Sequence, residues 1–475
     1  MIKQLDVVSN ATFSVITPSD ITFFTDLLPG RALFGEDILE DYERDEMTEY
    51  GRYRPDAVLF AKTVEEVSEI LRYCNERRLP VTLRGAGTGL CGGCVPVCGG
   101  VVLSTERMNR VLEVDTRNST ATVEAGVLLM DLPKALEGTG LFYPPDPGEK
   151  TATMGGNAMT NAGGMRAVRF GVTRDYVLGM EVVLASGEAL TLGGKVAKNS
   201  SGYSLIDLLI GSEGTLAVLT KLTVKLIPEP KVNLSVLALF DDLERCVEAV
   251  PSVLQCGEPT AVEFMEKEVI DAAQEYLGKP FPNPRGNACL LVRVDGPSRA
   301  ALESALDMLT DLLLGLGAKD VLLADTDERK QSIWNARGAF LEAIIGSTTS
   351  IDECDVVVPR DRVASFVRQS VRIGRECGVR VRSFGHAGDG NLHIYVCKDG
   401  LTDGEWAVRR EAAMDALYAV ARELGGQVSG EHGIGHAKAG YLEESIGGTQ
   451  VELMRGIKAV FDPNGILNPG KVIRP

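Results

Sequence analysis

The alternation of apolar and polar positions divides the chain into segments typical of an α+β protein. After a predicted capping box at Thr63–Glu66, apolar residues recur at helical spacing as far as Cys74, and Pro80 ends that helix. Residues 180–192 predict a hairpin, because two alternating segments flank the turn sequence at 185–188. Strands are expected at 81–84, 101–103, 111–114, 121–125, 180–184, 189–192 and 217–226.

From about residue 232 longer helical segments alternate with strands, which predicts a second α+β region on a mixed or antiparallel sheet. Helices are expected at about 261–277, 298–316, 361–377 and 449–461, and strands at about 289–294, 320–324 and 353–358. The chain therefore divides into four predicted parts: an N-terminal extension (1–50), a first domain (51–230), a second domain (231–422) and a C-terminal segment (423–475).

Composition agrees with a soluble globular protein of more than one domain. A chain of 475 residues is too long for a single domain with one ordinary hydrophobic core. Of its residues, 44% are hydrophobic and 24% are charged. The net charge of −17 argues against nucleic acid or an anionic membrane as the main partner. No transmembrane segment is expected, because no apolar run approaches the roughly 18 residues that span a bilayer. The first residues lack the apolar core of a signal peptide, so we expect a cytoplasmic location.

The ten cysteines are scattered, and in a cytoplasmic chain they are expected to be reduced thiols. Cys91, Cys94 and Cys98 form one cluster whose spacing suggests part of an iron–sulfur ligand set. The next cysteine is Cys246, so no fourth ligand follows nearby. We therefore favour small residues in a tight loop over a cluster site.

A glycine-rich loop follows the strand expected at 81–84. Residues 87–92 match the spacing GxGxxG, but the dinucleotide fingerprint requires a helix directly after the glycines. Here another strand follows, so the loop is not a Rossmann loop. It could be only a turn-rich connection, or its backbone N–H groups could bind a pyrophosphate. Further segments rich in glycine, asparagine or proline at 144–148, 154–157, 161–164, 171–173 and 211–216 favour a large cofactor.

All four histidines lie between His386 and His436, in two glycine-rich motifs. Imidazole is the commonest metal ligand and titrates near neutral pH. His386, His393 and Glu431 could hold a divalent metal with an open position, which leaves His432 as a base. The alternative is that these are ordinary polar loop residues. The ligand types suit Fe²⁺, Zn²⁺ or Mn²⁺ alike.

These glycine-rich motifs resemble the flavin-binding domain of the vanillyl-alcohol oxidase superfamily. From Arg54 to Lys471 the chain is similar to its branch of D-2-hydroxyacid dehydrogenases, which includes glycolate oxidase flavin subunits and D-lactate dehydrogenases. The resemblance implies a two-subdomain FAD-binding domain (51–230), a ferredoxin-like α+β cap domain (231–422) and a C-terminal segment returning to the active site. The motifs at 352–359 and 384–397 most resemble members that work with the α and β subunits of an electron-transferring flavoprotein.

The resemblance also implies roles for individual residues. His432 matches the catalytic histidine, Arg337 the arginine that holds the substrate carboxylate, and His386, His393 and Glu431 the metal ligands. FAD is expected to bind without a covalent link, because no histidine precedes His386 to form the usual tether. The implied FAD-binding residues are Arg84, Gly85, Ala86, Gly87, Thr88, Gly89, Pro145, Asp146, Gly148, Thr153, Gly155, Gly156, Asn157, Asn161, Gly163, Gly164, Gly171, Glu213, Gly214, Val218 and Asn468.

Two departures from the family pattern bear on the substrate. Members specific for hydroxyglutarate have a lysine within the stretch equivalent to 351–354, where this chain has Asp352 and Glu353, and asparagine in place of Tyr395. A monocarboxylate such as D-lactate is therefore favoured over a dicarboxylate. The expected reaction is oxidation of an (R)-2-hydroxyacid, with hydride transfer to flavin, metal assistance, and electrons passed to the electron-transferring flavoprotein.

Other functions stay open at this point. One is a glycolate oxidase flavin subunit that passes electrons to an iron–sulfur partner. A zinc hydrolase would contain no flavin, and a non-catalytic flavin-binding relay would contain flavin but show no metal dependence. The sequence also leaves a homodimer open.

Overall fold

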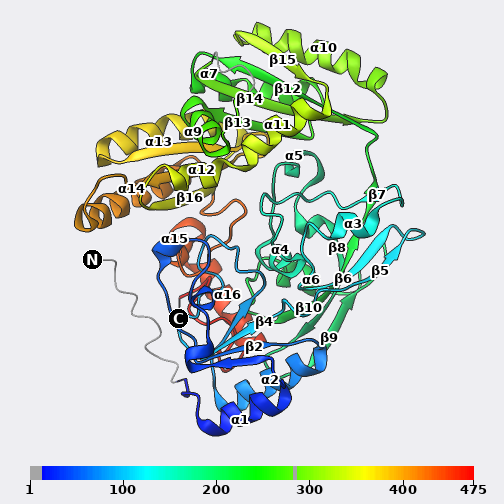
Figure 1. The fold of residues 1–475 in the computed structure, drawn as a ribbon, viewed down its shortest axis with the longest axis vertical. Coiled ribbons are helices and arrows are strands. Elements are labelled where there is room, and N and C mark those ends of the chain that lie inside the picture. The colour runs from blue at the N-terminus through cyan, green and yellow to red at the C-terminus, as the bar shows by residue number, and fades with distance from the viewer. Residues whose placement is uncertain (1–12, 282–285, 475) are drawn as a thin grey trace. The chain divides into compact units, whose positions relative to one another are not determined.

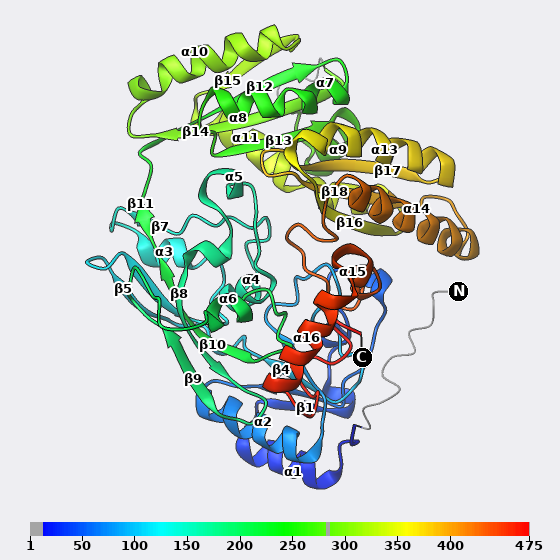
Figure 2. The ribbon, with the colours of Figure 1, turned by 180° about the vertical axis from the view of Figure 1, so that it is seen from behind.

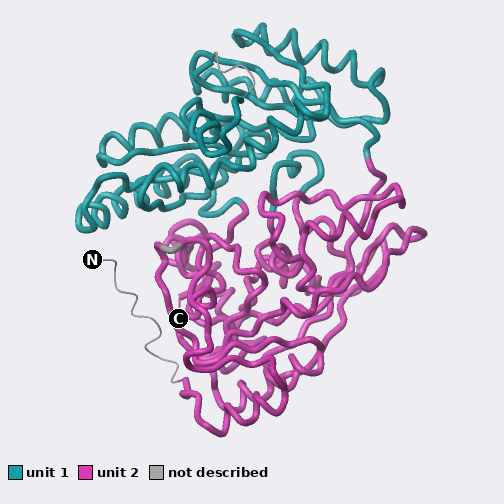
Figure 3. Tube along the Cα trace, in the orientation of Figure 1, with its two compact units in different colours: residues 1–3, 163–171, 230–430 teal, residues 4–162, 172–229, 431–475 magenta. Residues whose placement is uncertain are grey.

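A computed structural model gives the fold, and it describes residues 13–281 and 286–474. The chain forms two units, coloured separately in Figure 3. Of the described residues, the first unit contains 163–171, 230–281 and 286–430, and the second contains 13–162, 172–229 and 431–474. The first 12 residues of the predicted N-terminal extension lie outside the described residues.

One sheet of the second unit forms around the predicted strand at 81–84. Its order is β1-β2-β4-β3, with β2, β4 and β3 parallel. Figure 1 labels β2 and β4, the two central strands. Helices α1 and α2 share one apolar core with these strands, and Ile466 and Leu467 from the C-terminal segment enter the same core. The bounds are α1 Pro18–Leu27, β1 Ala32–Phe34, β2 Ala57–Phe60, α2 Val64–Arg77, β3 Val81–Arg84 and β4 Val101–Ser104. Short 3-10 turns lie at Gly35–Asp37, Glu40–Glu43 and Thr48–Tyr50.

Helix α2 begins where the sequence predicts, but with half of the predicted capping box. The Thr63 hydroxyl accepts a hydrogen bond from the Glu66 backbone N–H at 3.2 Å. The Glu66 carboxylate accepts instead from the Lys62 N–H at 2.7 Å and pairs with Arg31 at 2.5 Å. A long-range ion pair therefore replaces the reciprocal contact of the box.

A second, antiparallel sheet in this unit has the order β5-β6-β10-β8-β9, and the predicted hairpin is β8–β9. Its strands are β5 Val111–Asp115, β6 Thr120–Glu124, β8 Val177–Val183, β9 Ala189–Gly193 and β10 Val218–Lys225, and a small pair is formed by β7 Leu141–Phe142 and β11 Ile227–Pro228. The helical segments are α3 Leu132–Leu136, α4 Met154–Thr160, a 3-10 turn Thr173–Tyr176, α6 Leu205–Leu209, α15 Ala439–Ile446 and α16 Gly448–Phe461. The C-terminal segment returns to the first sheet, where Asn468 donates its backbone N–H to the Val81 carbonyl at 2.7 Å.

The first unit contains one seven-stranded antiparallel sheet with the order β15-β12-β14-β13-β17-β18-β16 (Figure 2). Its first four strands in chain order take positions 4-1-3-2, the ferredoxin-like arrangement. Strands β16, β18 and β17 repeat the 1-3-2 part, so the predicted ferredoxin-like cap is confirmed. The strands are β12 Val232–Phe240, β13 Ala261–Glu266, β14 Ala288–Gly296, β15 Asp320–Ala324, β16 Ile351–Val357, β17 Arg380–His386 and β18 Asn391–Cys397.

The helices of this unit pack against the strands of the sheet and against one another. Their bounds are α5 Ala167–Phe170, α7 Leu243–Glu248, α8 Val250–Cys256, α9 Lys267–Leu277, α10 Arg299–Gly315, α11 Asp327–Gly338, α12 Phe340–Gly346, a 3-10 turn Arg360–Arg362, α13 Val363–Cys377 and α14 Asp403–Glu423. Helices α13 and α14 lie side by side in both views (Figures 1 and 2). None of the helices within the described ranges is long and apolar enough to cross a membrane.

The helix predicted over 261–277 is wrong in its first third. Residues 261–266 form β13 in the middle of the sheet, and α9 begins only at Lys267. Six apolar-rich residues fit a buried strand as well as a helix, and strand pairing on both sides decides between them. The correction matters because β13 carries Glu263.

Candidate active site

One face of the seven-stranded sheet is lined with polar and charged side chains. Residues opposite one another in an antiparallel ladder share a face. Glu263 lies opposite His386, and Asp355 lies opposite His393. Phe384 pairs with His393 and so belongs to the same side. We call this the polar face.

The centre of the polar face is a buried cluster around Glu263, whose side chain is fully buried. Its carboxylate accepts hydrogen bonds from Arg337 Nε at 2.9 Å and from His386 Nδ1 at 2.8 Å, and Arg337 Nη2 lies 2.7 Å away. Burial alone would raise the pKa of Glu263, but the neighbouring His386 and Arg337 hold that pKa below its ordinary value. Arg337 also stacks its guanidinium 4.6 Å from the centre of the Phe384 ring, which fixes the end of α11 on this face.

His393 is enclosed by acidic side chains of β16. Its Nδ1 lies 3.6 Å from Glu353 Oε1 and 3.8 Å from Asp355 Oδ1. The Tyr395 hydroxyl donates to Glu353 at 2.6 Å, and burial together with this carboxylate raises the pKa of Tyr395 well above its ordinary value. The hydrogen-bonded pair of Tyr395 and Glu353 therefore lines one side of the His393 imidazole; we call this pair the wall beside His393.

Asp352 does not belong to this wall, although the sequence groups it with Glu353. Neighbouring residues of a strand point to opposite faces. Asp352 Oδ2 lies 3.7 Å from Arg410 Nε of α14, on the other side of the sheet. Of the two acidic residues in this stretch, only Glu353 can therefore act on a ligand at the polar face.

Asp355 anchors the loop that leads to Glu431. Its carboxylate accepts from the Ser429 hydroxyl at 2.8 Å, the Gly430 N–H at 3.1 Å and the Asn391 amide at 2.7 Å. Glu431 and His432 are the next residues along the chain, so the covalent backbone brings them to this place. Sequence analysis missed this role of Asp355.

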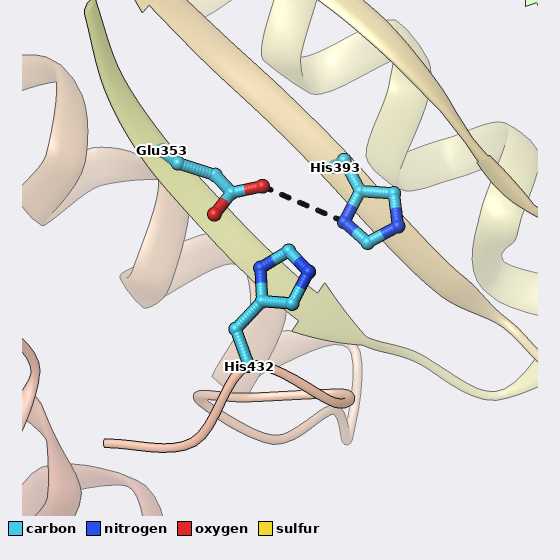
Figure 4. Close-up of side chains that lie close together, drawn as sticks. All are labelled: Glu353, His393 and His432. Atoms are coloured by element: carbon cyan, nitrogen blue, oxygen red, sulfur yellow. Dashed lines mark ion pairs between the residues drawn. The ribbon is translucent and has the colours of Figure 1, made fainter. Parts of the chain in front are cut away.

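The predicted metal ligands form a compatible set of donors. Ligand-type atoms of His386, His393 and Glu431 all lie within 4.8 Å of one another, and the same holds for Glu353, His393 and His432. Figure 4 shows the second group, with its two rings and one carboxylate directed toward one another. Two imidazoles and a carboxylate at this spacing fit a divalent transition metal.

Most of the predicted cofactor residues lie in the second unit. The GxGxxG segment lies between β3 and β4, as a strand–loop–strand connection without a following helix. At Gly85 any side chain would collide with the hydroxyl of Thr153. That hydroxyl also accepts the Gly156 N–H at 3.0 Å, which begins α4. Predicted residues from two distant segments therefore form one glycine-lined surface.

Glu213 and Asn468 extend this surface from two more segments. The Asn468 amide donates to the Glu213 carbonyl at 2.7 Å and to the Gly93 carbonyl at 2.9 Å. Glu213 accepts the backbone N–H groups of Ile434 and Gly435 at 2.7 and 2.8 Å. Among the described residues, the buried Asn468 Oδ1 and Asn157 Nδ2 have no hydrogen-bond partner. Buried polar atoms of this kind suit a hydrogen-bonding cofactor such as FAD.

Other predicted cofactor residues are placed differently. Val218 is buried in the apolar core of the first sheet, so only its backbone is left for a cofactor. Asp146 is bonded by Lys150 Nζ at 2.5 Å. Gly163, Gly164 and Gly171 are grouped with the first unit.

Two charged residues that the sequence did not single out, Asp45 and Lys471, lie near the glycine loop together with the predicted Arg84. Asp45 accepts the Gly92 N–H at 2.5 Å, and burial raises the pKa of Asp45 to about 7. Burial lowers the pKa of Lys471 to about 8. Arg84 Nη1 donates to Cys94 Sγ at 3.2 Å, and no cysteine in the described residues forms a disulfide. The cations Arg84 and Lys471 suit an anionic group such as a pyrophosphate.

The fourth histidine, His436, has a different environment from the other three. It is 6% exposed and packs edge-on against Tyr50 and Tyr53. Its ring also fills the space beside Gly92, whose φ of +72° favours glycine. Burial, assisted by Lys471, lowers the pKa of His436 from 6.5 to about 4.

We expect His436 to make the protein sensitive to mild acid. Below pH 6.5 the unfolded chain takes up a proton that the folded state refuses until about pH 4, so stability present above pH 6.5 is lost as pH falls. Between pH 7 and pH 5 this costs about 2 kcal/mol of unfolding free energy. Urea unfolding at both pH values should show a smaller loss for His436→Leu, and equal losses would contradict the assignment.

Comparison with known proteins places this arrangement in a family. A model of the C-terminal domain of FAD-linked oxidases matches residues 229–472, and a model of an FAD binding domain matches residues 55–204. The chain belongs to the FAD-linked oxidases. This FAD-linked oxidase is 48% identical over 470 residues to a D-lactate dehydrogenase of Anaerostipes hadrus, covering 98% of this chain and 99% of that protein.

Two further relatives lie in the same branch. A D-lactate dehydrogenase of Archaeoglobus fulgidus is 43% identical, and the alignment covers 86% of this chain and 89% of that protein. The glycolate oxidase subunit GlcD of Bacillus subtilis is 38% identical, covering 94% and 93%. The resemblance to the D-lactate and glycolate branch of the vanillyl-alcohol oxidase superfamily is thus confirmed.

Solved structures agree on the fold of this FAD-linked oxidase. p-Cresol methylhydroxylase with substrate bound aligns with a TM-score of 0.80 at 19% identity, covering 98% of this chain and 99% of that chain. A 4-ethylphenol oxidase from Gulosibacter chungangensis aligns with a TM-score of 0.78 at 21% identity, covering 98% and 99%. The chain is an FAD-binding oxidoreductase, as predicted.

Proposed function

We propose that this enzyme oxidises a small (R)-2-hydroxyacid, with D-lactate as the favoured substrate and pyruvate as the product. The observation that carries the proposal is the buried cluster in which Glu263 bonds both Arg337 and His386. In this cluster Arg337, a cation that can bind the substrate carboxylate, lies beside His386, an imidazole that can bind a metal. The similarity to two D-lactate dehydrogenases supports the same substrate class.

Each polar side chain then has a role in the proposed reaction. Bound FAD supplies the hydride acceptor, and a divalent metal (Fe²⁺, Zn²⁺ or Mn²⁺) supplies a Lewis acid. Arg337 binds the substrate carboxylate through charge-assisted hydrogen bonds. His432 accepts the proton of the substrate hydroxyl. His386, His393 and Glu431 would hold the metal, and the predicted glycine and asparagine loops would hold FAD without a covalent link.

We propose that the wall beside His393 restricts the size and charge of the substrate. Glu353 is fully buried and bonded by Tyr395, which places a carboxylate next to the imidazole. A second carboxylate on the substrate would meet a like charge there. A methyl group, as in D-lactate, carries no such cost.

We further propose that electrons leave this chain for the α and β subunits of an electron-transferring flavoprotein in the cytoplasm. The motifs at 352–359 and 384–397 resemble members with that partner. Residues 51–230 would act as the FAD-binding domain, 231–422 as the cap and 423–475 as the segment that completes the active site. A homodimer is left open.

The similarity to GlcD favours one second candidate, a glycolate oxidase subunit that passes electrons to an iron–sulfur partner. Glycolate lacks the methyl group of lactate, and the same cation and metal site would bind it. The two functions differ in substrate preference and in electron acceptor, so one experiment can separate them.

The test is anaerobic flavin reduction in the purified FAD-bound protein. D-lactate should bleach the flavin band with a second-order rate constant at least about 100-fold above that of D-2-hydroxyglutarate, because a buried like charge costs a few kcal/mol. Chelation should abolish the reaction, and NAD⁺ alone should not restore the oxidised spectrum. Preference for glycolate would favour the second candidate. A flavin that no 2-hydroxyacid reduces would contradict both.

A further inference from the structure

One buried carboxylate joins the two halves of the proposed site. Glu263 lies in the centre of the sheet, on β13, with β14 on one side and β17 on the other. Its oxygens lie 2.7–3.0 Å from nitrogens of Arg337 and His386, and its side chain has no exposed surface. A buried carboxylate is costly unless it is paired and hydrogen-bonded, and these contacts supply both.

The contact with His386 fixes the orientation and tautomer of the ring. A carboxylate can only accept hydrogen bonds in its ionised form, so Nδ1 of His386 donates to Glu263. The lone pair is then on Nε2, the nitrogen on the other side of the ring. Carboxylates that hold metal-binding histidines in this way raise the basicity of the ligand.

The contact with Arg337 fixes the guanidinium at the same time. Nε and Nη2 both face Glu263, so the edge that carries Nη1 is turned away from it. Phe384 lies under the plane of the group and prevents it from tilting. One carboxylate therefore sets the direction of the cation and of the imidazole relative to each other, within a single unit.

We propose that Glu263 is a positioning residue that couples substrate-carboxylate binding by Arg337 to metal binding by His386. The inference rests on the proposed function, because it assigns Arg337 and His386 the roles given there. Glutamate is suited to this position since a glutamine has one acceptor oxygen and would turn its NH₂ group toward one of the two donors. Neutralising Glu263 should thus impair both partners together.

The test compares Glu263→Gln with Glu266→Gln in the FAD-bound protein. Glu266 lies on the same strand, but it faces the other side of the sheet, is buried and is bonded by Ser383. Mn²⁺ binding, measured by electron paramagnetic resonance of the free ion, should weaken 10- to 100-fold in Glu263→Gln, the range typical of such partners. The KM for D-lactate should rise at least about 10-fold, from the lost orientation of Arg337. Both values should stay within about twofold of wild type in Glu266→Gln.

The outcomes separate a positioning role from a structural one. Lower thermal stability of Glu263→Gln with unchanged Mn²⁺ affinity and KM would overturn the inference. If Glu263→Gln is not recovered folded, Glu263→Asp replaces it, since it keeps the charge at a shorter reach. A severalfold loss of Mn²⁺ affinity is expected there, and wild-type affinity would overturn the inference. Failure of the proposed function would be seen in a different measurement: D-lactate would not reduce the flavin of the wild-type protein.

Discussion

Replacing His386 by alanine should remove the bound metal and lower kcat/KM for D-lactate by at least about 1,000-fold, the scale of Lewis-acid assistance. FAD should stay bound at wild-type stoichiometry, because the loops around Gly85, Thr153 and Asn468 belong to the second unit and His386 to the first. Folding should be little affected, since Glu263 keeps its contacts with Arg337. Elemental analysis, flavin absorbance and dye-linked turnover measure the three quantities.

Ser383→Ala is the matched control for this variant. Ser383 lies on the same strand, β17, but its hydroxyl bonds Glu266 on the side opposite the polar face. Metal content and turnover should stay within about twofold of wild type there. A His386→Ala protein that keeps its metal, or more than a tenth of wild-type turnover, would show that His386 is not a ligand.

How much of this site the sequence predicts depends on the kind of signal each residue leaves. The histidine motifs stand out because a rare residue type is confined to two glycine-rich segments. The glycine and asparagine loops stand out for a similar reason, and the structure brings Gly85, Thr153 and Glu213 into one unit. The fold class followed from element order and from the resemblance, and the observed sheets confirm it.

Glu263 left no such signal. It lies in a short apolar segment that fits a helical pattern as well as a strand, so its partners could not be inferred from spacing. Arg337 and His386 lie 74 and 123 residues away along the chain. Pairing of β13 with β17 brings His386 next to Glu263, and the position of helix α11 brings Arg337 there. Contacts between such distant segments are not encoded in local periodicity.

The same limit explains the acidic pair in β16. The sequence suggested that Asp352 and Glu353 act together, yet neighbouring strand residues point to opposite faces. Which of the two faces a ligand depends on the register of β16 against β18, where Glu353 lies opposite Tyr395. The proposed restriction on substrate charge therefore rests on Glu353 and its partner Tyr395. Asp352 instead faces Arg410 of α14.

Arg337→Met should raise the KM for D-lactate and lower kcat/KM by about 100- to 1,000-fold, because two charge-assisted hydrogen bonds to the substrate are lost. The same change leaves Glu263 fully buried with His386 as its partner at 2.8 Å. Removing the cation of a buried ion pair destabilises by up to about 3–5 kcal/mol, so the melting temperature should fall as well. Arg337→Lys keeps a cation near Glu263 and should recover stability more fully than activity, since an ammonium lacks the planar fork.

The double variant Arg337→Met with Glu263→Gln separates the two effects. Removing both charges eliminates the buried imbalance, so its stability should exceed that of Arg337→Met alone. Its kcat/KM for D-lactate should stay low, because no cation is left for the substrate carboxylate. Kinetics and thermal unfolding of the single and double variants provide the measurement. Recovery of activity together with stability would show that Arg337 supports the fold around Glu263 and does not bind the substrate.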